Sequence, residues 1–251
     1  MYNLSGKLTW LTAVVLMAGL GLLGSGAAAD TFVSYNGKFH FTYPETWVQV
    51  DYTTAEYYLT HGDPENEVDF EAVFSEKQTF VIFQGQYLIL TVDTVGPGTT
   101  ELVDSVLKEL SDEFSRPIKE VSPEEFLSGS LTDTIAFDRT NNLVSIQTEV
   151  AGRDAGPRVS LLVMKFYEHG IANYYFYAPK VEFFPSLSTY RDMAMSFSTE
   201  AVEKAPADEV RVADLEDDDD DTGMPVAVYG GLAAVLIAIV ALRMRSRAKK
   251  R

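Results

Sequence analysis

The sequence contains no cysteine and only three histidines among its 251 residues. Without cysteine, the chain can form no disulfide, thiolate nucleophile or cysteine metal site, and no cysteine is available for lipoprotein acylation. His40, His61 and His169 show none of the spacings of metal-ligand motifs. A folded domain in this chain must therefore be stabilised by its hydrophobic core.

Basic residues are also scarce, with 20 Lys and Arg against 37 Asp and Glu in the whole chain. Residues 30–204 hold 12 basic and 28 acidic side chains, a net charge of −16. Nucleic-acid binding needs a basic surface, so this composition excludes nucleic acid as a partner.

The N-terminus has the pattern of a signal peptide. Lys7 precedes an apolar stretch over 8–24, and the small residues Ala27 and Ala29 precede Asp30. Signal peptidase accepts only small side chains at those two positions. We expect residues 1–29 to be removed by cleavage after Ala29; the alternative is that they remain as an uncleaved anchor.

The C-terminus has the pattern of a membrane anchor. Residues 224–242 are uncharged, and a helix of that length spans roughly 28 Å, close to the hydrocarbon thickness of a bilayer. Six of the nine residues 243–251 are basic, which places this tail in the cytoplasm. We therefore expect a single-pass type I protein in the cell membrane, with an extracytoplasmic N-terminal domain.

Small residues recur along one side of the predicted span, at Ala227, Gly231, Ala234, Ala238 and Ala241. Such a seam lets two membrane helices approach closely. It predicts packing against a second copy or another membrane helix; the alternative is that the span is a plain anchor.

Residues 205–223 connect the domain to the span. They hold nine acidic residues and one arginine, including five consecutive aspartates. This composition predicts an extended, disordered stalk. Weak cation binding is an alternative, both for the stalk and for the acidic loop from His61 to Asp69.

Alternating apolar residues predict strands in the domain over 30–204. Phe39, Phe41 and Tyr43 alternate with polar residues before Pro44, which predicts a hairpin into a strand that starts at Trp47. We expect Trp47 in the core; the alternative is a ligand platform. Further strands are predicted at 69–74, 79–85, 86–95, 131–139 and 143–150, and on both sides of the His169–Gly170 turn in 159–179.

Helical periodicity predicts two amphipathic helices between these strands. One covers 99–114, with an apolar stripe at Leu102, Val103, Val106, Leu107, Leu110 and Phe114. The other covers 181–197, with Phe183, Leu187, Tyr190, Ala194 and Phe197. A short third helix is predicted after Ser122, where Glu125 is placed for a capping box. The expected fold class is α+β, with a central antiparallel sheet flanked by helices, an α/β/α sandwich, and one C-terminal transmembrane helix.

The order of these elements resembles that of PsbP-like domains. The resemblance covers roughly 34–198 and depends on Phe39, Phe41, Pro44 and Trp47 near the start and on Ser196 and Phe197 at the end. The group includes the photosystem subunit PsbP, a Ran-binding import factor and bacterial envelope lipoproteins. It implies an α/β/α sandwich that binds partners, and it carries no shared active site to this chain.

No catalytic, cofactor-binding or metal-ligating residue can be nominated from the sequence. Serines lie in neither Gly-x-Ser-x-Gly nor Ser-x-x-Lys, and Glu124 and Glu125 are expected in the first turn of a helix. The sequence thus predicts a membrane-anchored, non-enzymatic interaction or assembly module of the cell envelope, with an unidentified envelope or membrane protein as partner. The alternatives are an extracytoplasmic hydrolase and a carrier of a small ligand or lipid.

Overall fold

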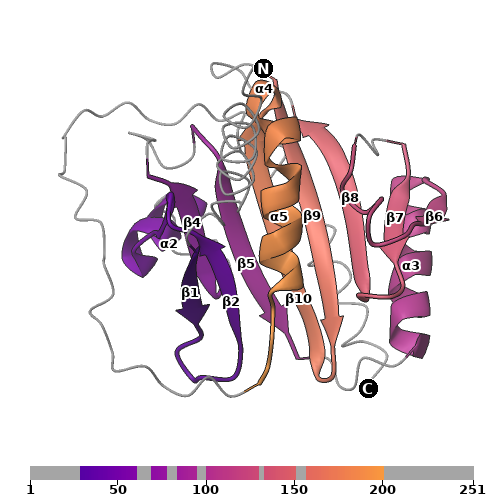
Figure 1. The fold of residues 1–251 in the computed structure, drawn as a ribbon, viewed down its shortest axis with the longest axis horizontal. Helices are drawn as coiled ribbons and strands as arrows, with labels where there is room; N and C mark the ends of the chain where they lie inside the picture. The colour runs from indigo at the N-terminus through magenta and orange to yellow at the C-terminus, as the bar shows by residue number, and fades with distance from the viewer. Residues whose placement is uncertain are drawn as a thin grey trace, which may run out of the picture.

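An eight-stranded sheet is the centre of the fold in the computed structural model, which describes residues 29–60, 69–77, 84–94, 100–129, 133–150 and 157–200 (Figure 1). The strand order is β3-β4-β5-β10-β9-β8-β7-β6. The strands are β3 (Trp47–Gln49), β4 (Ala72–Glu76), β5 (Tyr87–Asp93), β6 (Ile118–Glu120), β7 (Ile135–Asp138), β8 (Leu143–Val150), β9 (Arg158–Tyr167) and β10 (Gly170–Pro179). Neighbours pair antiparallel, except β6 and β7, which are parallel.

The longest strands, β9 and β10, form the middle of the sheet. They are ten residues each and pair along their whole length, joined by a turn at Glu168 and His169. Nearly every residue of β10 is buried. A strand with both faces buried needs apolar side chains at consecutive positions, and β10 provides them with aromatic and small residues.

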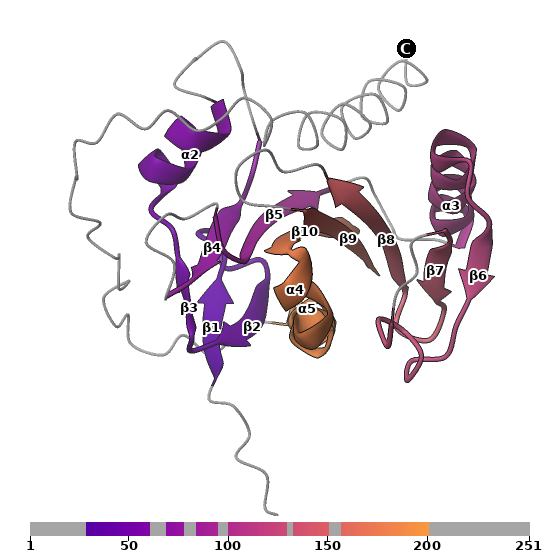
Figure 2. The same ribbon diagram turned by 90° about the horizontal axis from the view of Figure 1, so that it is seen from above.

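One face of the sheet is covered by the C-terminal helices and a small second sheet (Figure 2). These elements are α4 (Lys180–Phe183), the 3-10 turn η1 (Phe184–Ser186), α5 (Leu187–Met195), and the antiparallel pair β1 (Ala29–Val33) and β2 (His40–Pro44). Aromatic rings fill the interface: Phe176 stacks on Tyr190 with ring centroids 4.3 Å apart, and Phe41 meets Tyr174 edge-on at 5.6 Å.

The other face is covered by α2 (Tyr52–Thr60) and α3 (Thr100–Phe114), which lie opposite α4 and α5 in Figure 2. Val103, Val106, Leu107 and Leu110 of α3 are buried, as the predicted stripe requires. Leu102 and Phe114, at the margins of that stripe, are partly buried. Helices therefore lie on both faces of a large central sheet, and the predicted α+β class is confirmed.

The predicted hairpin between Phe39 and Trp47 is wrong. β2 pairs with β1, whereas Trp47 begins β3 and pairs with β4 in the large sheet. The chain leaves one sheet at Pro44 and enters the other at Trp47. The pairing differs because β1, which the sequence analysis did not predict, occupies the edge of β2. Trp47 itself is in the core, 4% exposed.

The short helix predicted after Ser122 is also wrong. Residues 123–127 form turns, with Phe126 N donating to Ser122 O at 3.0 Å. Leu127 has φ of 56°, which ends the helical path after one turn. Ser122 Oγ does accept from Glu125 N, at 3.3 Å, so the capping interaction exists without the helix.

Other differences concern shorter elements. Helix α2 and strand β6 were not predicted, and the strand predicted at 69–74 is β4, shifted to Ala72–Glu76. The antiparallel strands β7 and β8 are joined by a turn that contains Asn141 and Asn142, with Asn142 at φ 52°. Most of the strand predicted at 79–85 lies outside the described residues.

The predicted membrane topology also lies largely outside the described residues. This applies to residues 1–28 of the signal peptide, the stalk at 205–223, the span at 224–242 and the tail at 243–251. Among the helices that the structure describes, none is long and apolar enough to cross a membrane.

Candidate functional site

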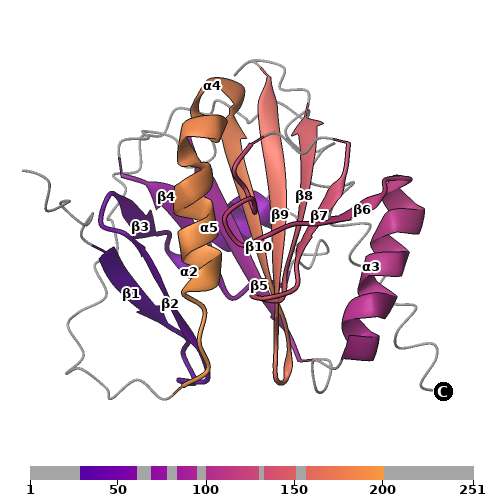
Figure 3. The same cartoon turned by 45° about the vertical axis from the view of Figure 1, so that its right-hand side comes forward.

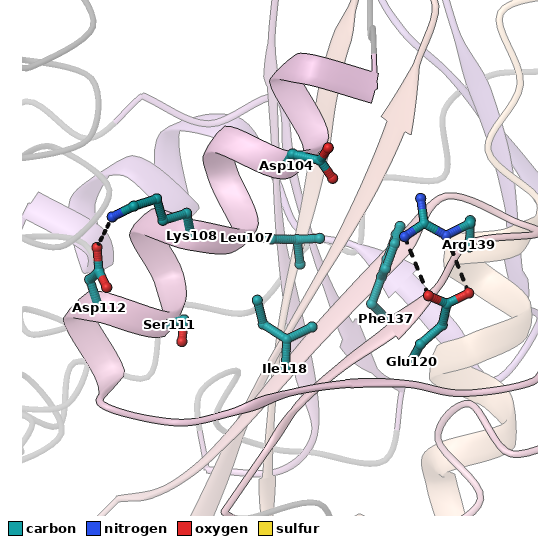
Figure 4. Close-up of a pocket in the computed structure, with 9 residues that line it drawn as sticks. All are labelled: Asp104, Leu107, Lys108, Ser111, Asp112, Ile118, Glu120, Phe137 and Arg139. Carbon is teal, nitrogen blue, oxygen red and sulfur yellow. Dashed lines mark hydrogen bonds and ion pairs between the residues drawn. The ribbon is translucent and has the colours of Figure 1, made fainter.

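An open groove lies between α3 and the strands β6 and β7, at one edge of the sheet (Figure 4). Figure 3 brings this side forward and shows α3 and β6 together at the margin of the fold, opposite β1 and β2. The groove has a volume of about 420 Å³. Its lining residues are Asp104, Leu107, Lys108, Ser111 and Asp112 of α3, Ile118 and Glu120 of β6, Phe137 of β7, and Arg139.

Apolar side chains lie in the middle of this groove. Figure 4 shows Leu107, Ile118 and Phe137 between the two ion pairs of the rim. Leu107 and Phe137 belong to the core and are 5% and 2% exposed, whereas Ile118 is 41% exposed. Ile118 therefore offers apolar surface to a bound molecule without a change in the core.

The two ion pairs on the rim are exposed. Lys108 Nζ lies 2.6 Å from Asp112 Oδ2 on α3. Arg139 contacts both carboxylate oxygens of Glu120, at 3.2 and 3.3 Å, and its guanidinium lies 5.0 Å from the ring centroid of Phe137. Exposed pairs of this kind contribute little to stability, because water screens the two charges. A ligand can therefore exchange partners with them at small cost.

The histidines considered in the sequence analysis lie on separate elements. His40 on β2 is partly buried, and its Nδ1 is buried without a hydrogen-bond partner among the described residues. His169 is in the β9–β10 turn, and its Nε2 lies 3.9 Å from Oε2 of Glu168. His61 and most of its acidic loop lie outside the described residues.

The carboxylates of the described ranges form no group of three or more that could hold a metal ion. Glu124 and Glu125 lie in a turn instead of the predicted helix. Hydrogen bonds from its own backbone N–H and from Ser122 lower the pKa of Glu124. The adjacent glutamates Glu124 and Glu125 are therefore explained by the local structure of this turn.

Burial strongly affects the pKa of four tyrosines in the core, Tyr87, Tyr174, Tyr177 and Tyr190. Burial raises the pKa of Tyr177 to about 12, and it raises the pKa of the other three phenols as well. Tyr190 Oη donates to Gln86 Oε1 at 2.6 Å. These phenols remain neutral at ordinary pH and pack in the core instead of lining the groove.

A buried arginine, Arg158, is the first residue of β9. Arg158 is 4% exposed, and its two terminal nitrogens donate to the carbonyl oxygens of Gln84 and Gly85 at 2.6 and 2.5 Å. Burial lowers the pKa of Arg158. Its contacts attach the segment before β5 to β9, which is a structural role.

The sequence analysis did not identify the groove. It predicted α3 and its buried stripe, but β6 is three residues long and follows α3 after only three residues. The available signal was Ile118, an isolated apolar residue between Pro117 and the charged pair Lys119 and Glu120. The groove arises because β6 pairs parallel to β7, which the local sequence does not specify.

Neither a family model nor a curated protein matches the sequence. Among solved structures, the chain is similar to a protein of Bacteroides thetaiotaomicron, with 10% identity and a TM-score of 0.43 over 68% of this chain and 48% of that one. The chain thus spans about half of that protein's length.

Two further structures are similar. Cyanobacterial PsbP (CyanoP) of Synechocystis sp. PCC 6803 has 14% identity and a TM-score of 0.39, over 72% of this chain and 98% of that one. LpqN of Mycobacterium tuberculosis, involved in cell envelope biogenesis, has 10% identity and a TM-score of 0.38, over 69% and 86%. A PsbP is thus among the similar structures, in agreement with the resemblance predicted from the sequence. At these TM-scores, no site or activity follows from the similarities.

Proposed function

We propose that the protein is a membrane-anchored, non-enzymatic interaction or assembly module of the cell envelope, and that the groove beside α3 binds its partner. The predicted signal peptide and span support the location. The single observation that supports binding is the exposure of Ile118 in a groove rimmed by labile ion pairs. Apolar surface surrounded by polar groups is typical of partner-binding sites.

The charge of the domain supports a protein partner of complementary sign. Residues 30–204 carry a net charge of −16, so a basic surface on the partner accelerates the encounter and opposes binding to acidic proteins. The predicted stalk of 205–223 extends the reach of the domain from the membrane, so the partner can be a membrane protein or a soluble envelope protein.

A charged side chain at the groove tests this function in the full-length protein. Detergent-solubilised membranes that contain tagged Ile118→Arg should lose the crosslinked partner bands captured by the wild-type chain. Met195→Arg is the matched control, because Met195 is 40% exposed, close to the 41% of Ile118, and lies on α5 across the sheet. Unchanged bands with Ile118→Arg would refute the groove as the binding surface.

A further inference from the structure

Strand β6 ends the large sheet on the side of the groove. It pairs only with β7 among the described strands. Pro117 O accepts from Ile135 N at 2.9 Å, and Val121 N donates to Phe137 O at 3.0 Å. In a parallel ladder, alternate residues of a strand bond to the neighbour. Residues 117, 119 and 121 therefore face β7, and the backbone groups of Ile118 and Glu120 face away.

These outward groups form a repeat that another strand can use. Ile118 and Glu120 each present one N–H and one C=O group, and the two residues are separated by one residue. This spacing matches the hydrogen-bonding period of an extended chain. The side chains of Ile118 and Glu120 both line the groove, so an added strand would also contact the apolar middle of that groove. The edge and the groove are therefore two parts of one continuous surface.

The charge of α3 determines which side chains suit this surface. The helix carries five acidic residues and one lysine, of which Asp104, Lys108 and Asp112 line the groove. Asp112 and Glu120 are each paired with one cation, but Asp104 makes no ion pair with the described residues. The surface beside β6 therefore complements lysine or arginine and repels acidic side chains.

We infer that the edge of β6 binds an extended, basic segment of a partner protein, which adds to the sheet as a further strand. Its backbone bonds to Ile118 and Glu120, an apolar side chain packs on Ile118, and a lysine or arginine lies beside Asp104. The inference rests on the proposed function, because it names the class of segment that the groove binds.

The test uses the full-length chain in detergent, immobilised and exposed to a displayed library of random 12-residue peptides. Enriched peptides should carry two or more Lys or Arg residues interspersed with apolar residues, and raised salt should weaken their binding. Acidic peptides should be depleted.

Two substitutions with matched controls localise the binding. Ile118→Pro removes one outward N–H, and because that N–H is not bonded to β7, the strand pairing is retained. It should weaken the enriched peptides about tenfold, the usual effect of losing a hydrogen bond and its packing, whereas Ile118→Val should leave affinity nearly unchanged. Asp104→Lys should weaken basic peptides about fivefold, and Asp192→Lys on α5 should not.

Three outcomes would overturn the inference: no enrichment above a support without protein, enrichment of acidic or uncharged peptides, or equal affinity for wild type and Ile118→Pro. A failed library together with loss of the crosslinked partners in Ile118→Arg would leave the proposed function in place and exclude only the extended basic segment. A failed library together with unchanged crosslinked bands in Ile118→Arg would reject both the inference and the proposed function.

Discussion

Gly170, the first residue of β10, lies against the backbone carbonyl of Asp93, the last residue of β5. A Cβ added to Gly170 would be 1.8 Å from that oxygen and 2.9 Å from its carbon. The contact is with backbone, so no side-chain rotation relieves it. The β9–β10 turn can therefore close beside β5 only because position 170 has no side chain.

Gly170→Ala should destabilise the domain by about 1–3 kcal/mol or more, because the added methyl forces β5 and β10 apart. Chemical denaturation of the purified protein measures this loss. Gly129→Ala is the control, because nothing lies within 4 Å of a Cβ at that position. Equal stability of the two variants would contradict the close approach.

Trp47 is 4% exposed and meets Tyr190 edge-on, with ring centroids 6.3 Å apart. Trp47→Ala should cost about 3–5 kcal/mol, the usual loss for a buried large aromatic side chain. In a chain that begins at Asp30, Trp47 is the only tryptophan. Its emission should be blue-shifted and weakly quenched by iodide; ready quenching would indicate an exposed ring and revive the ligand-platform interpretation.

Asp138 organises the turn between β7 and β8. The side chain is 1% exposed, and its oxygens accept from Asn141 N at 3.1 Å and Asn141 Nδ2 at 2.6 Å. Asp138→Ala removes both acceptors and should cost about 1–3 kcal/mol, because the backbone N–H of Asn141 loses its partner. Asp138→Asn keeps an acceptor oxygen and should recover part of the loss. If thermal unfolding distinguishes neither variant from wild type, the turn does not depend on this side chain.

The elements best predicted from the sequence are those whose local pattern agrees with their packing. The stripe of α3 faces the sheet as predicted, and the hairpin of β9 and β10 follows from two apolar runs around His169 and Gly170. Tertiary contacts reinforce a choice that the local sequence already favours.

Pairing partners could not be predicted in the same way. The alternation of Phe39 and Phe41 identifies a strand, but it does not reveal that β1 occupies the neighbouring position or that Trp47 belongs to another sheet. Strand pairing depends on residues distant in sequence, and nearest neighbours along the chain are only the default partners.

The groove was unpredictable for a related reason. Its apolar and charged residues come from α3, β6 and β7, and they meet only because a three-residue strand pairs parallel to β7. Neither Ile118 nor Arg139 belongs to a local motif. A site of this kind becomes visible once the topology is known, since periodicity reports which face is buried and not which strand ends the sheet.

Buried tyrosines should make the domain sensitive to alkali. Burial raises the pKa of Tyr177 from the ordinary value of 10.0 for a tyrosine to about 12. Between these values, the unfolded chain loses a proton that the folded state retains, so stability is complete below pH 10 and falls as the pH rises toward 12. The pKa values of Tyr87, Tyr174 and Tyr190 shift in the same direction and add to the effect.

Tyr177→Phe should therefore flatten the dependence of unfolding free energy on pH above 10, by about 1.4 kcal/mol per pH unit for one proton. The variant loses the hydrogen bond between Tyr177 and Ser160, which lowers stability at every pH, so the slope and not the absolute stability is the readout. Tyr35→Phe is the control, because Tyr35 is fully exposed and its phenol meets solvent in both states. Urea denaturation at intervals from pH 8 to about 12 measures the slopes. Parallel curves for wild type and Tyr177→Phe would mean that the phenol reaches solvent in the folded protein, contrary to its position stacked on Tyr87 with ring centroids 4.8 Å apart.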